Sequence, residues 1–257
     1  MQETSDLYKS IIEGNHWFET KVVIGDEFYL IDEEANYITF GGVCIYYDSD
    51  SGGFGENMLK EVKTYQHVFT DDKPAIGCCV AGEIDVTMVK PTAYIARMSS
   101  IKPFVRACND TQQSEWLPKG VFYIDTREES ETTNEITFHG YDAMLKAEAD
   151  FPTNNGDIGT WPVADYNVVA YIASLMGVEV DERTYEVMQR GYMIEYPAGY
   201  SQREVLSFVA AMYAGNFIMT DEGKLRLVRI NEIGIETHFL VDNNGYSITF
   251  GGDSILV

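Results

Sequence analysis

The first part of the chain, to about residue 140, consists of short apolar-rich segments separated by clusters of turn-forming residues. At residues 83–88, EIDVTM, polar and apolar residues alternate without a break. Successive side chains of a strand point to opposite faces, so this spacing predicts a strand with one solvated face. Eight segments have the composition of strands: 21–24, 27–31, 37–40, 43–47, 75–89, 94–107, 120–125 and 135–139. Short strands at this density are typical of a sandwich or a barrel.

Beyond Phe151 the hydrophobic spacing changes to that of helices. Residues 152–162, PTNNGDIGTWP, form a cluster of turn formers. After it, a stripe at helical spacing predicts a helix with one buried face. Its members are Val168, Tyr171, Ile172 and Leu175. Asp165 is the expected N-cap of this helix, and Gly177 is its expected end.

A second helix is predicted to begin after Ser201. Ser201 and Glu204 have the spacing of a capping box, and Tyr200 is expected to pack against Val205 as a hydrophobic staple. The expected buried face consists of Val205, Phe208, Val209 and Met212. Residues 216–230 then predict two strands joined by a turn at 221–223, which is a β-hairpin.

Two segments of the chain resemble each other. Residues 30–42, LIDEEANYITFGG, align without a gap with residues 240–252, LVDNNGYSITFGG. A duplicated β unit is the favoured interpretation because the match spans both expected strands and the loop between them. Two unrelated hairpins with similar turn chemistry remain the alternative. The last hairpin is expected either to close the first barrel or to begin a second unit.

Charge is the strongest signal in the composition. The 257 residues include 41 acidic and 18 basic side chains, which gives a formal net charge of −23. This charge repels phosphate backbones and anionic membrane surfaces, so it argues against direct nucleic-acid binding. It does not exclude a wall past which DNA slides without adhering.

Neither the cysteines nor the N-terminal residues indicate an extracellular or membrane protein. Cys44, Cys78, Cys79 and Cys108 lack metal-binding spacing, and we interpret them as small apolar core residues made in a reducing cytosol. The N-terminal residues lack the pattern of a secretory signal, and we expect no membrane-spanning segment.

No motif commits the sequence to catalysis. The HExxH, GxSxG, Walker A and GxGxxG patterns are absent, and the four histidines lack metal-ligand spacing. We interpret His139 and Asp142 as a polar turn with an Asp cap. DSDSGG at 48–53 resembles half a calcium loop, but Leu59 stands at the twelfth position, so a flexible turn is favoured. We therefore predict no catalytic, cofactor-binding or metal-binding residues, and no cofactor.

Five segments in a fixed order resemble the N-terminal hub region of phage tail proteins, the tail-associated lysin and baseplate hub family. They are IGCCVAGEIDVTM (76–88), IKPFVRACND (101–110), EWLPKGVFYIDT (115–126), ITFHGYDAM (136–144) and QREVLSFVAAMYAGNFIMTDEGKLRL (202–227). The resemblance covers about residues 70–230. Residues 1–70 match no part of the family pattern, and no spike, fibre-binding or peptidase segment follows.

The resemblance implies an α+β fold that is predominantly β: a tail-tube-like β-barrel domain at 1–150, a helical insert with a β-hairpin at 151–230, and a last hairpin at 231–257. It implies a virion protein, made in the host cytoplasm, that forms a homotrimeric hub or baseplate ring without enzymatic activity. Its partners would be adjacent tail-tube, distal-tail or tip proteins, and DNA would only pass through the lumen. The hairpin tip at 127–134 would face either solvent or a neighbouring subunit.

Two other classes of function stay open. A carbohydrate- or cell-surface-binding β module would use Trp17, Trp116 or Trp161 as sugar-stacking platforms. A hydrolase would use Glu83 and Asp85 as its acid/base pair, because residues two apart in a strand share a face.

Overall fold

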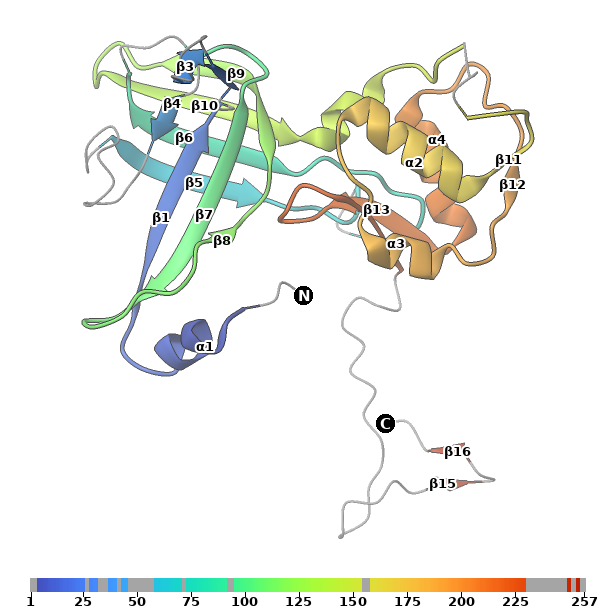
Figure 1. The fold of residues 1–257 in the computed structure, drawn as a ribbon, viewed down its shortest axis with the longest axis horizontal. Helices are drawn as coiled ribbons and strands as arrows, with labels where there is room; N and C mark the ends of the chain where they lie inside the picture. The colour runs from blue at the N-terminus through green and yellow to red at the C-terminus, as the bar shows by residue number, and fades with distance from the viewer. Residues whose placement is uncertain are drawn as a thin grey trace.

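The computed structural model describes residues 4–25, 28–31, 37–40, 43–45, 58–70, 73–91, 95–153, 158–229, 249–250 and 253–254. These residues form a large antiparallel sheet beside a smaller unit of helices and a β-hairpin (Figure 1). A predominantly β fold with some helices is confirmed. Within the described ranges, no helix combines the length and the apolar character needed to cross a lipid bilayer.

The large sheet is an open path of antiparallel strands. Its order is β4 (Val43–Ile45), β1 (Trp17–Ile24), β7 (Ser100–Cys108), β9 (Phe122–Glu129), β10 (Glu135–Asp142), β6 (Glu83–Val89) and β5 (Leu59–Tyr65), and β8 (Leu117–Pro118) also pairs with β7. In the part of the chain that the structure describes, no pairing joins β5 to β1 or β4, so the closed barrel expected from the sequence is not present there.

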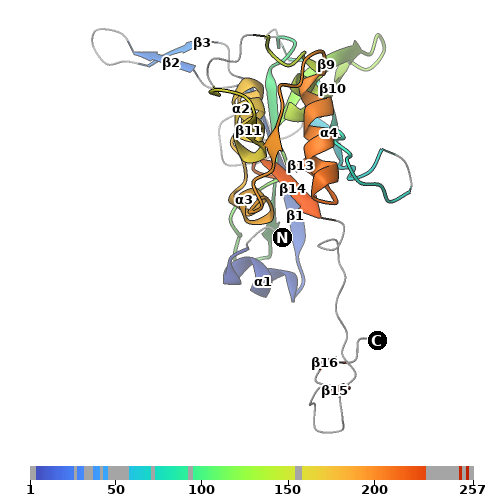
Figure 2. The same ribbon diagram turned by 90° about the vertical axis from the view of Figure 1, so that its right-hand side faces the viewer.

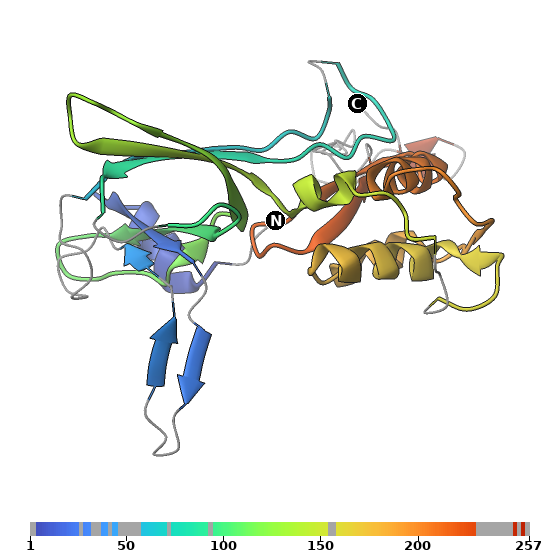
Figure 3. The ribbon, with the colours of Figure 1, turned by 90° about the horizontal axis from the view of Figure 1, so that it is seen from above.

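The sheet folds over on itself between β7 and β9. These two strands share only the pairs Ser100 with Tyr123 and Ile101 with Phe122, whereas β1 pairs with β7 along all eight of its residues. Pro103 lies where β7 leaves β9, and its carbonyl accepts the Lys119 N–H at 2.9 Å. Proline has no N–H to donate at this position, which suits a break in the ladder. The two halves of the sheet therefore face each other (Figure 3).

The first core lies between these two halves. The alternation predicted at 83–88 is confirmed, because the apolar positions are buried and the polar ones are half-exposed. The buried residues of this core are Val22, Ile24, Leu59, Ile84, Val86, Met88, Ile95, Ile101, Phe122, Ile124, Ile136 and Phe138. A bulge in β10 between His139 and Gly140 bends the sheet over this core. A Cβ at Gly140 would lie 2.5 Å from the Tyr123 carbonyl oxygen, so this position requires glycine.

The second unit begins where β10 ends. It contains η1 (Ala143–Glu148), β11 (Val163–Ala164), α2 (Asp165–Met176), α3 (Glu182–Val187), β12 (Met193–Ile194), α4 (Gln202–Met212), β13 (Gly215–Met219) and β14 (Leu225–Arg229). The hairpin predicted around residues 221–223 is confirmed by the pairing of β13 with β14. A separate core of buried residues joins η1, α2, α4 and the hairpin, and it includes Cys79 from the connection between β5 and β6.

That connection crosses from the sheet to the second unit and back. Residues 75–82 were expected to belong to a long strand, but β6 begins only at Glu83. Asn216, fully buried at the start of β13, donates to the Ala75 carbonyl at 2.9 Å and accepts the Cys78 N–H at 2.8 Å. Cys79 then forms a parallel bridge with Phe217. The segment is held by the second unit because it serves as an extra strand there.

Two of the three predicted helix ends are confirmed. Ser201 and Glu204 form the capping box of α4, and Gly177 ends α2 in the left-handed conformation with a φ of 72°. The expectation for Asp165 was wrong, because Ala164 is the N-cap of α2. Asp165 is the first residue of the helix, fully buried, and it accepts the Tyr213 hydroxyl at 2.6 Å. Burial, followed by this hydrogen bond, raises the pKa of Tyr213.

We expect Ser201→Ala to lower the free energy of unfolding by about 1 kcal/mol, because it removes the side-chain acceptor from the capping box. Urea denaturation of the two proteins measures the effect. Ser174→Ala, at an exposed position of α2, is the control, and equal losses in both variants would contradict the capping role.

The predicted buried stripes of both helices were partly wrong. Leu175 is 42% exposed, Phe208 is 51% exposed and Met212 is 43% exposed. In their place Met176, Leu206 and Ala210 are buried. On both helices, the face that packs against the rest of the second unit is thus rotated from the predicted face by about one residue. Tyr200 contacts the ring of Phe208 at a centroid distance of 5.1 Å. The expected packing of Tyr200 against Val205 stays a prediction.

The remaining elements lie outside the two cores. Helix α1 (Asp6–Ile12) and strand β5 were not predicted from the sequence. Strands β2 (Phe28–Ile31) and β3 (Tyr37–Phe40) pair with each other, as do β15 (Thr249–Phe250) and β16 (Asp253–Ser254). The repeated ITF segments thus take different partners, since β3 pairs with the strand before it and β15 with the strand after it. Most of the second repeat, and the loop of the first, lie outside the described residues. The division at residues 150 and 230 stays a prediction.

Candidate functional site

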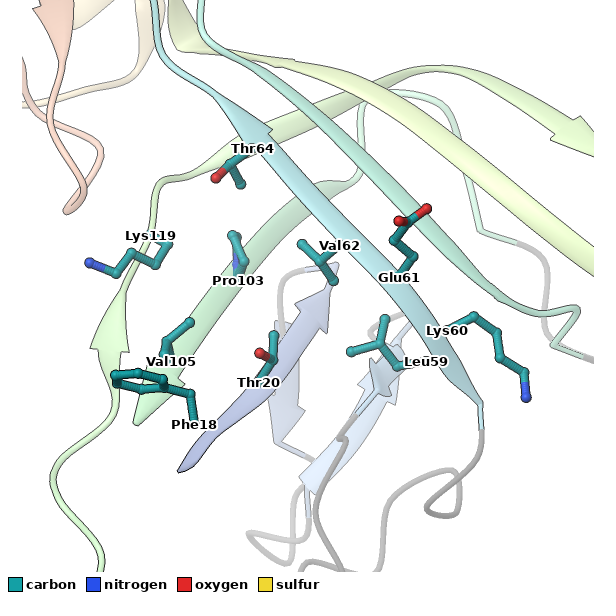
Figure 4. Close-up of a pocket in the computed structure, with 10 residues that line it drawn as sticks. All are labelled: Phe18, Thr20, Leu59, Lys60, Glu61, Val62, Thr64, Pro103, Val105 and Lys119. Carbon is teal, nitrogen blue, oxygen red and sulfur yellow. The ribbon is translucent and has the colours of Figure 1, made fainter. Parts of the chain in front are cut away.

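An open cleft lies at the seam where β5 faces β1 and β7 (Figure 4). Its volume is about 480 Å³. The residues that line it are Phe18, Thr20, Leu59, Lys60, Glu61, Val62, Thr64, Pro103, Val105 and Lys119. The sequence did not single out these residues, because Phe18 precedes the expected first strand and β5 was missed.

The walls of the seam cleft continue the inner face of the sheet. Along β1, Phe18 and Thr20 share the face of Val22, which is fully buried. Phe18 itself is 52% exposed, although it is a large aromatic residue on a face that is elsewhere core. Val62 on β5 and Val105 on β7 are half-buried and point toward the same space. The apolar core is therefore open to solvent at this end of the seam.

The charged residues of the seam cleft are two lysines and one glutamate. Lys60 and Lys119 lie at its two ends, and Glu61 is the third charged residue of the lining. Glu61 pairs with Lys63 at 2.8 Å. The Lys119 ammonium lies 3.9 Å from the Asp221 carboxylate. Two of three charged residues are thus lysines in a chain with more than twice as many acids as bases.

A second cleft, of about 760 Å³, separates the sheet from α3 and the β13–β14 hairpin. Asp181 and Arg183 are an ion pair within its lining. Arg183 binds Asp181 at 2.5 Å, and this hydrogen bond lowers the pKa of Asp181. Asp221 at the hairpin turn accepts the Gly120 N–H with its carbonyl at 3.0 Å and the Gln66 amide with its carboxylate at 3.3 Å. At this cleft, the turn of the β13–β14 hairpin is hydrogen-bonded to residues that flank the strands of the large sheet.

The carboxylates proposed for a hydrolase lie on the solvated outer face of the sheet. Glu83 and Asp85 share that face, as the sequence predicted. Asp85 contacts the His139 Nδ1 at 2.7 Å across the β6–β10 pair. Neither of the two clefts includes Glu83 or Asp85. Asp85 and His139 therefore form a polar contact on the surface of the sheet, away from both clefts.

The cap interpretation of His139 and Asp142 is confirmed for Asp142. Its carboxylate accepts the Met144 N–H at 2.9 Å, which caps η1, and the Gly82 N–H at 2.7 Å. Burial raises the pKa of Asp142 to about 6, against the lowering effect of these two N–H donors. The His139 ring contacts Asp85.

The three tryptophans proposed as sugar platforms have different surroundings. Trp116 is stacked between the Lys21 ammonium at 4.9 Å and the Arg106 guanidinium at 4.4 Å. Trp161 packs edge-on against Tyr196 at a centroid distance of 5.6 Å. Trp17 is 47% exposed and lies at the start of β1.

The described cysteines are buried, as predicted for core residues. Cys78, Cys79 and Cys108 are free thiols, and the side chain of Cys44 lies outside the described residues. Burial raises the pKa of Cys79 to about 11, and it also raises the pKa of Cys108. Among described side chains, no group of three or more His, Cys, Asp or Glu is placed to hold a metal ion. The DSDSGG segment lies outside the described residues.

We expect a thiol reagent at about pH 8 to leave Cys78, Cys79 and Cys108 unmodified in the folded chain, because the thiolate is the reactive form and access is blocked. Mass spectrometry of peptides labelled before and after denaturation tests this. Full modification of Cys79 in the native protein would contradict the burial described above.

Comparison with known proteins gives no assignment to a family. No protein-family model matches the chain, and no curated protein matches it. The 43 kDa tail protein of prophage MuSo2 from Shewanella oneidensis has a crystal structure that is similar over 84% of this chain and 56% of that protein, with a TM-score of 0.48 and 11% identity. The tail protein from Neisseria meningitidis MC58 is similar over 82% of this chain and 51% of its own, with a TM-score of 0.44 and 10% identity. The chain thus spans about half the length of these tail proteins.

Proposed function

We propose that the chain is a structural subunit of a phage or prophage tail, in the hub or baseplate ring that continues the tail tube and connects it to the tail tip. The observation that carries the proposal is that the large sheet folds over on itself and, among the described residues, no strand pairing closes it into a barrel. Its apolar inner face is open at the seam cleft, where Phe18 is half-exposed. A sheet with an open core edge is suited to completion by a neighbouring molecule.

The segments that resemble the tail hub family also correspond to whole parts of the fold. Residues 83–88 lie in β6, 101–108 in β7, 122–126 in β9 and 136–142 in β10, which are all strands of the large sheet. Residues 202–227 cover α4, β13 and most of β14 in the second unit. The resemblance thus follows complete packing units, which supports a common architecture over a chance match of turns.

The proposed subunit is a homotrimer with a β-barrel-like tube domain, without catalytic activity of its own. Its partners are adjacent tail-tube, distal-tail or tip proteins, its location is the virion, and DNA only passes its acidic surface. The carbohydrate-binding alternative is not proposed, because Trp116 stacks on Lys21 and Arg106 and Trp161 packs against Tyr196 within the chain.

Light scattering over a concentration series tests the subunit state. The proposal predicts a mass near three times 29.0 kDa and a ring with a central channel in electron micrographs of the same sample. A discrete dimer with no ring-shaped particles would contradict the trimeric hub.

A further inference from the structure

Two passages of the chain between the large sheet and the second unit lie side by side. The chain returns to the sheet at Gly82, directly before β6, and it leaves the sheet again at Asp142, the last residue of β10 (Figure 1). The Asp142 N–H donates to the Gly82 carbonyl at 2.9 Å, and the Asp142 carboxylate accepts the Gly82 N–H at 2.7 Å. These two hydrogen bonds fasten one passage to the other, and we call the pair the junction.

The same carboxylate also fixes the start of η1. It accepts the Met144 N–H at 2.9 Å, and Asp142 as a whole is 6% exposed. The packing around it is close, because a Cβ at Gly82 would lie 2.9 Å from the carboxylate and 3.2 Å from the Tyr65 carbonyl oxygen. Asp142 therefore holds the sheet, the returning passage and the first turn of the second unit at one buried point.

A second contact between the sheet and the second unit is made by the turn of the β13–β14 hairpin, whose strands pack against α4 and α3 (Figure 2). The Asp221 carbonyl accepts the Gly120 N–H at 3.0 Å, and its carboxylate accepts the amide of the exposed Gln66 at 3.3 Å. The cleft of about 760 Å³ lies beside this contact. Hinges between packed units are formed by a few residues at the ends of elements, with a cleft that opens or closes as the hinge turns. The junction occupies the position of such a hinge.

The surroundings of the Asp142 carboxyl act on its charge in opposite directions. Burial raises its pKa to about 6, against the lowering effect of the two N–H donors and of the Arg203 guanidinium. Arg203 also donates to a backbone carbonyl of η1 at 2.9 Å and pairs with Glu148 at 2.8 Å. Water solvates a carboxylate better than this buried site does, so ionisation favours a state in which the carboxyl is exposed. The titratable or charged side chains of the elements around the carboxyl are Tyr65 of β5, Cys79 of the connection between β5 and β6, Glu83 of β6, Tyr141 of β10, Lys146 and Glu148 of η1, and Arg203 of α4.

We propose that Asp142 is a pH-sensitive clamp on the junction, and that the sheet and the second unit separate there more readily when its carboxyl is ionised than when it is protonated. In the closed junction the charge is buried, whereas opening exposes it to water. The closed state is therefore favoured most at low pH, and this advantage is lost as the pH rises through the raised pKa of about 6. The inference goes beyond the proposed function, because it concerns a single chain whether or not copies assemble.

Native-state hydrogen exchange of the full chain tests the clamp. The Gly82 and Met144 amides donate to the Asp142 carboxylate, so their exchange, corrected for the intrinsic rate at each pH, measures the opening of the junction. We expect the protection of both amides to be about tenfold lower at about pH 7.5 than at about pH 5, which follows from a pKa of 3.8 in the open and about 6 in the closed junction. Their protection should also stay below that of the Leu227 amide, which donates to the buried Thr184 hydroxyl within the second unit at 3.0 Å. Equal protection of all three amides would overturn the proposal, as would protection of Gly82 and Met144 that does not change with pH.

Two asparagine variants separate Asp142 from the other titrating groups. In Asp142→Asn the side chain cannot ionise, so the protection of the junction amides should agree at the two pH values to within about twofold. Asp181→Asn is the matched control, because Asp181 is also 6% exposed and also caps a helix, but its carboxylate bonds Arg183 of α3. The tenfold change should remain in that variant. A change of the same size in Asp142→Asn would assign the response to another group and overturn the clamp, and the wild-type comparison needs neither variant.

Discussion

Asn216→Ala is expected to lower the free energy of unfolding by about 2 kcal/mol, because it leaves the buried Cys78 N–H without its acceptor and removes the half-buried hydrogen bond to the Ala75 carbonyl. The amide of Asn216 is fully buried and satisfies both the Ala75 carbonyl and the Cys78 N–H. These two groups belong to the segment that crosses from the sheet to the second unit. Losing the amide therefore weakens the attachment between the two cores as well as the local packing.

Urea denaturation followed by circular dichroism measures this effect, with Asn167→Ala as the control. Asn167 is exposed on α2, so its replacement should change the free energy of unfolding by about 0.5 kcal/mol or less. Limited proteolysis gives a second readout, since residues 75–82 should become the first site of cleavage in the Asn216 variant. Equal stabilities for the two variants would contradict the role given to Asn216.

Lowering the pH is expected to stabilise the folded chain through Asp142. Burial raises the pKa of this carboxyl from 3.8 to about 6 in the folded state, so the folded chain binds the proton more tightly than the unfolded chain does. Its stabilising contribution is complete below pH 3.8 and is lost as the pH rises through about 6. The charged groups around it are the Arg203 guanidinium of α4 and, as the ion-pair partner of Arg203, Glu148 of η1.

The free energies of unfolding of the wild type and of Asp142→Asn are to be compared at about pH 7.5 and pH 5. From pH 7.5 to pH 5, the free energy of unfolding of the wild type should rise by about 1.4 kcal/mol relative to that of Asp142→Asn, because pH 5 lies one unit below the folded pKa. Because both proteins share every other titrating group, the comparison isolates Asp142. A difference that is the same at both pH values would show that Asp142 keeps its ordinary pKa.

The elements that the sequence predicted correctly are those that depend on interactions between residues close together in the chain. The alternation at residues 83–88, the capping box at Ser201 and the left-handed end at Gly177 each depend on neighbours within a few residues, and all three are confirmed. Strand β5 was missed because Lys60, Glu61 and Lys63 interrupt its apolar positions, and a bulge between Leu59 and Glu61 shifts the alternation. A sheet end strand has one neighbour, so its sequence needs little apolar character.

The seam cleft was not predictable from the sequence for a different reason. Phenylalanine is usually a core residue, so the sequence alone suggests that Phe18 is buried. In the fold, Phe18 lies at an end of the sheet that the opposite half does not cover. The exposed Phe208 and Met212 on α4 follow the same rule, since helical spacing fixes which residues share a face but not which face the neighbours cover. By contrast, the absence of the HExxH, GxSxG, Walker A and GxGxxG motifs can be established from the sequence alone, because each of these motifs is a short contiguous pattern.

The most direct test of the proposed tail role is the location of the chain in purified tail particles. Particles are to be isolated from cells that carry the gene, washed in high salt, and examined by quantitative mass spectrometry and by immunogold labelling with antibody against the chain. We expect the chain to remain in the tail fraction at a fixed ratio to the tube protein, and the gold label to lie at the tip end of the tube. Complete recovery of the chain in the soluble fraction, with unlabelled and otherwise complete tails, would contradict it.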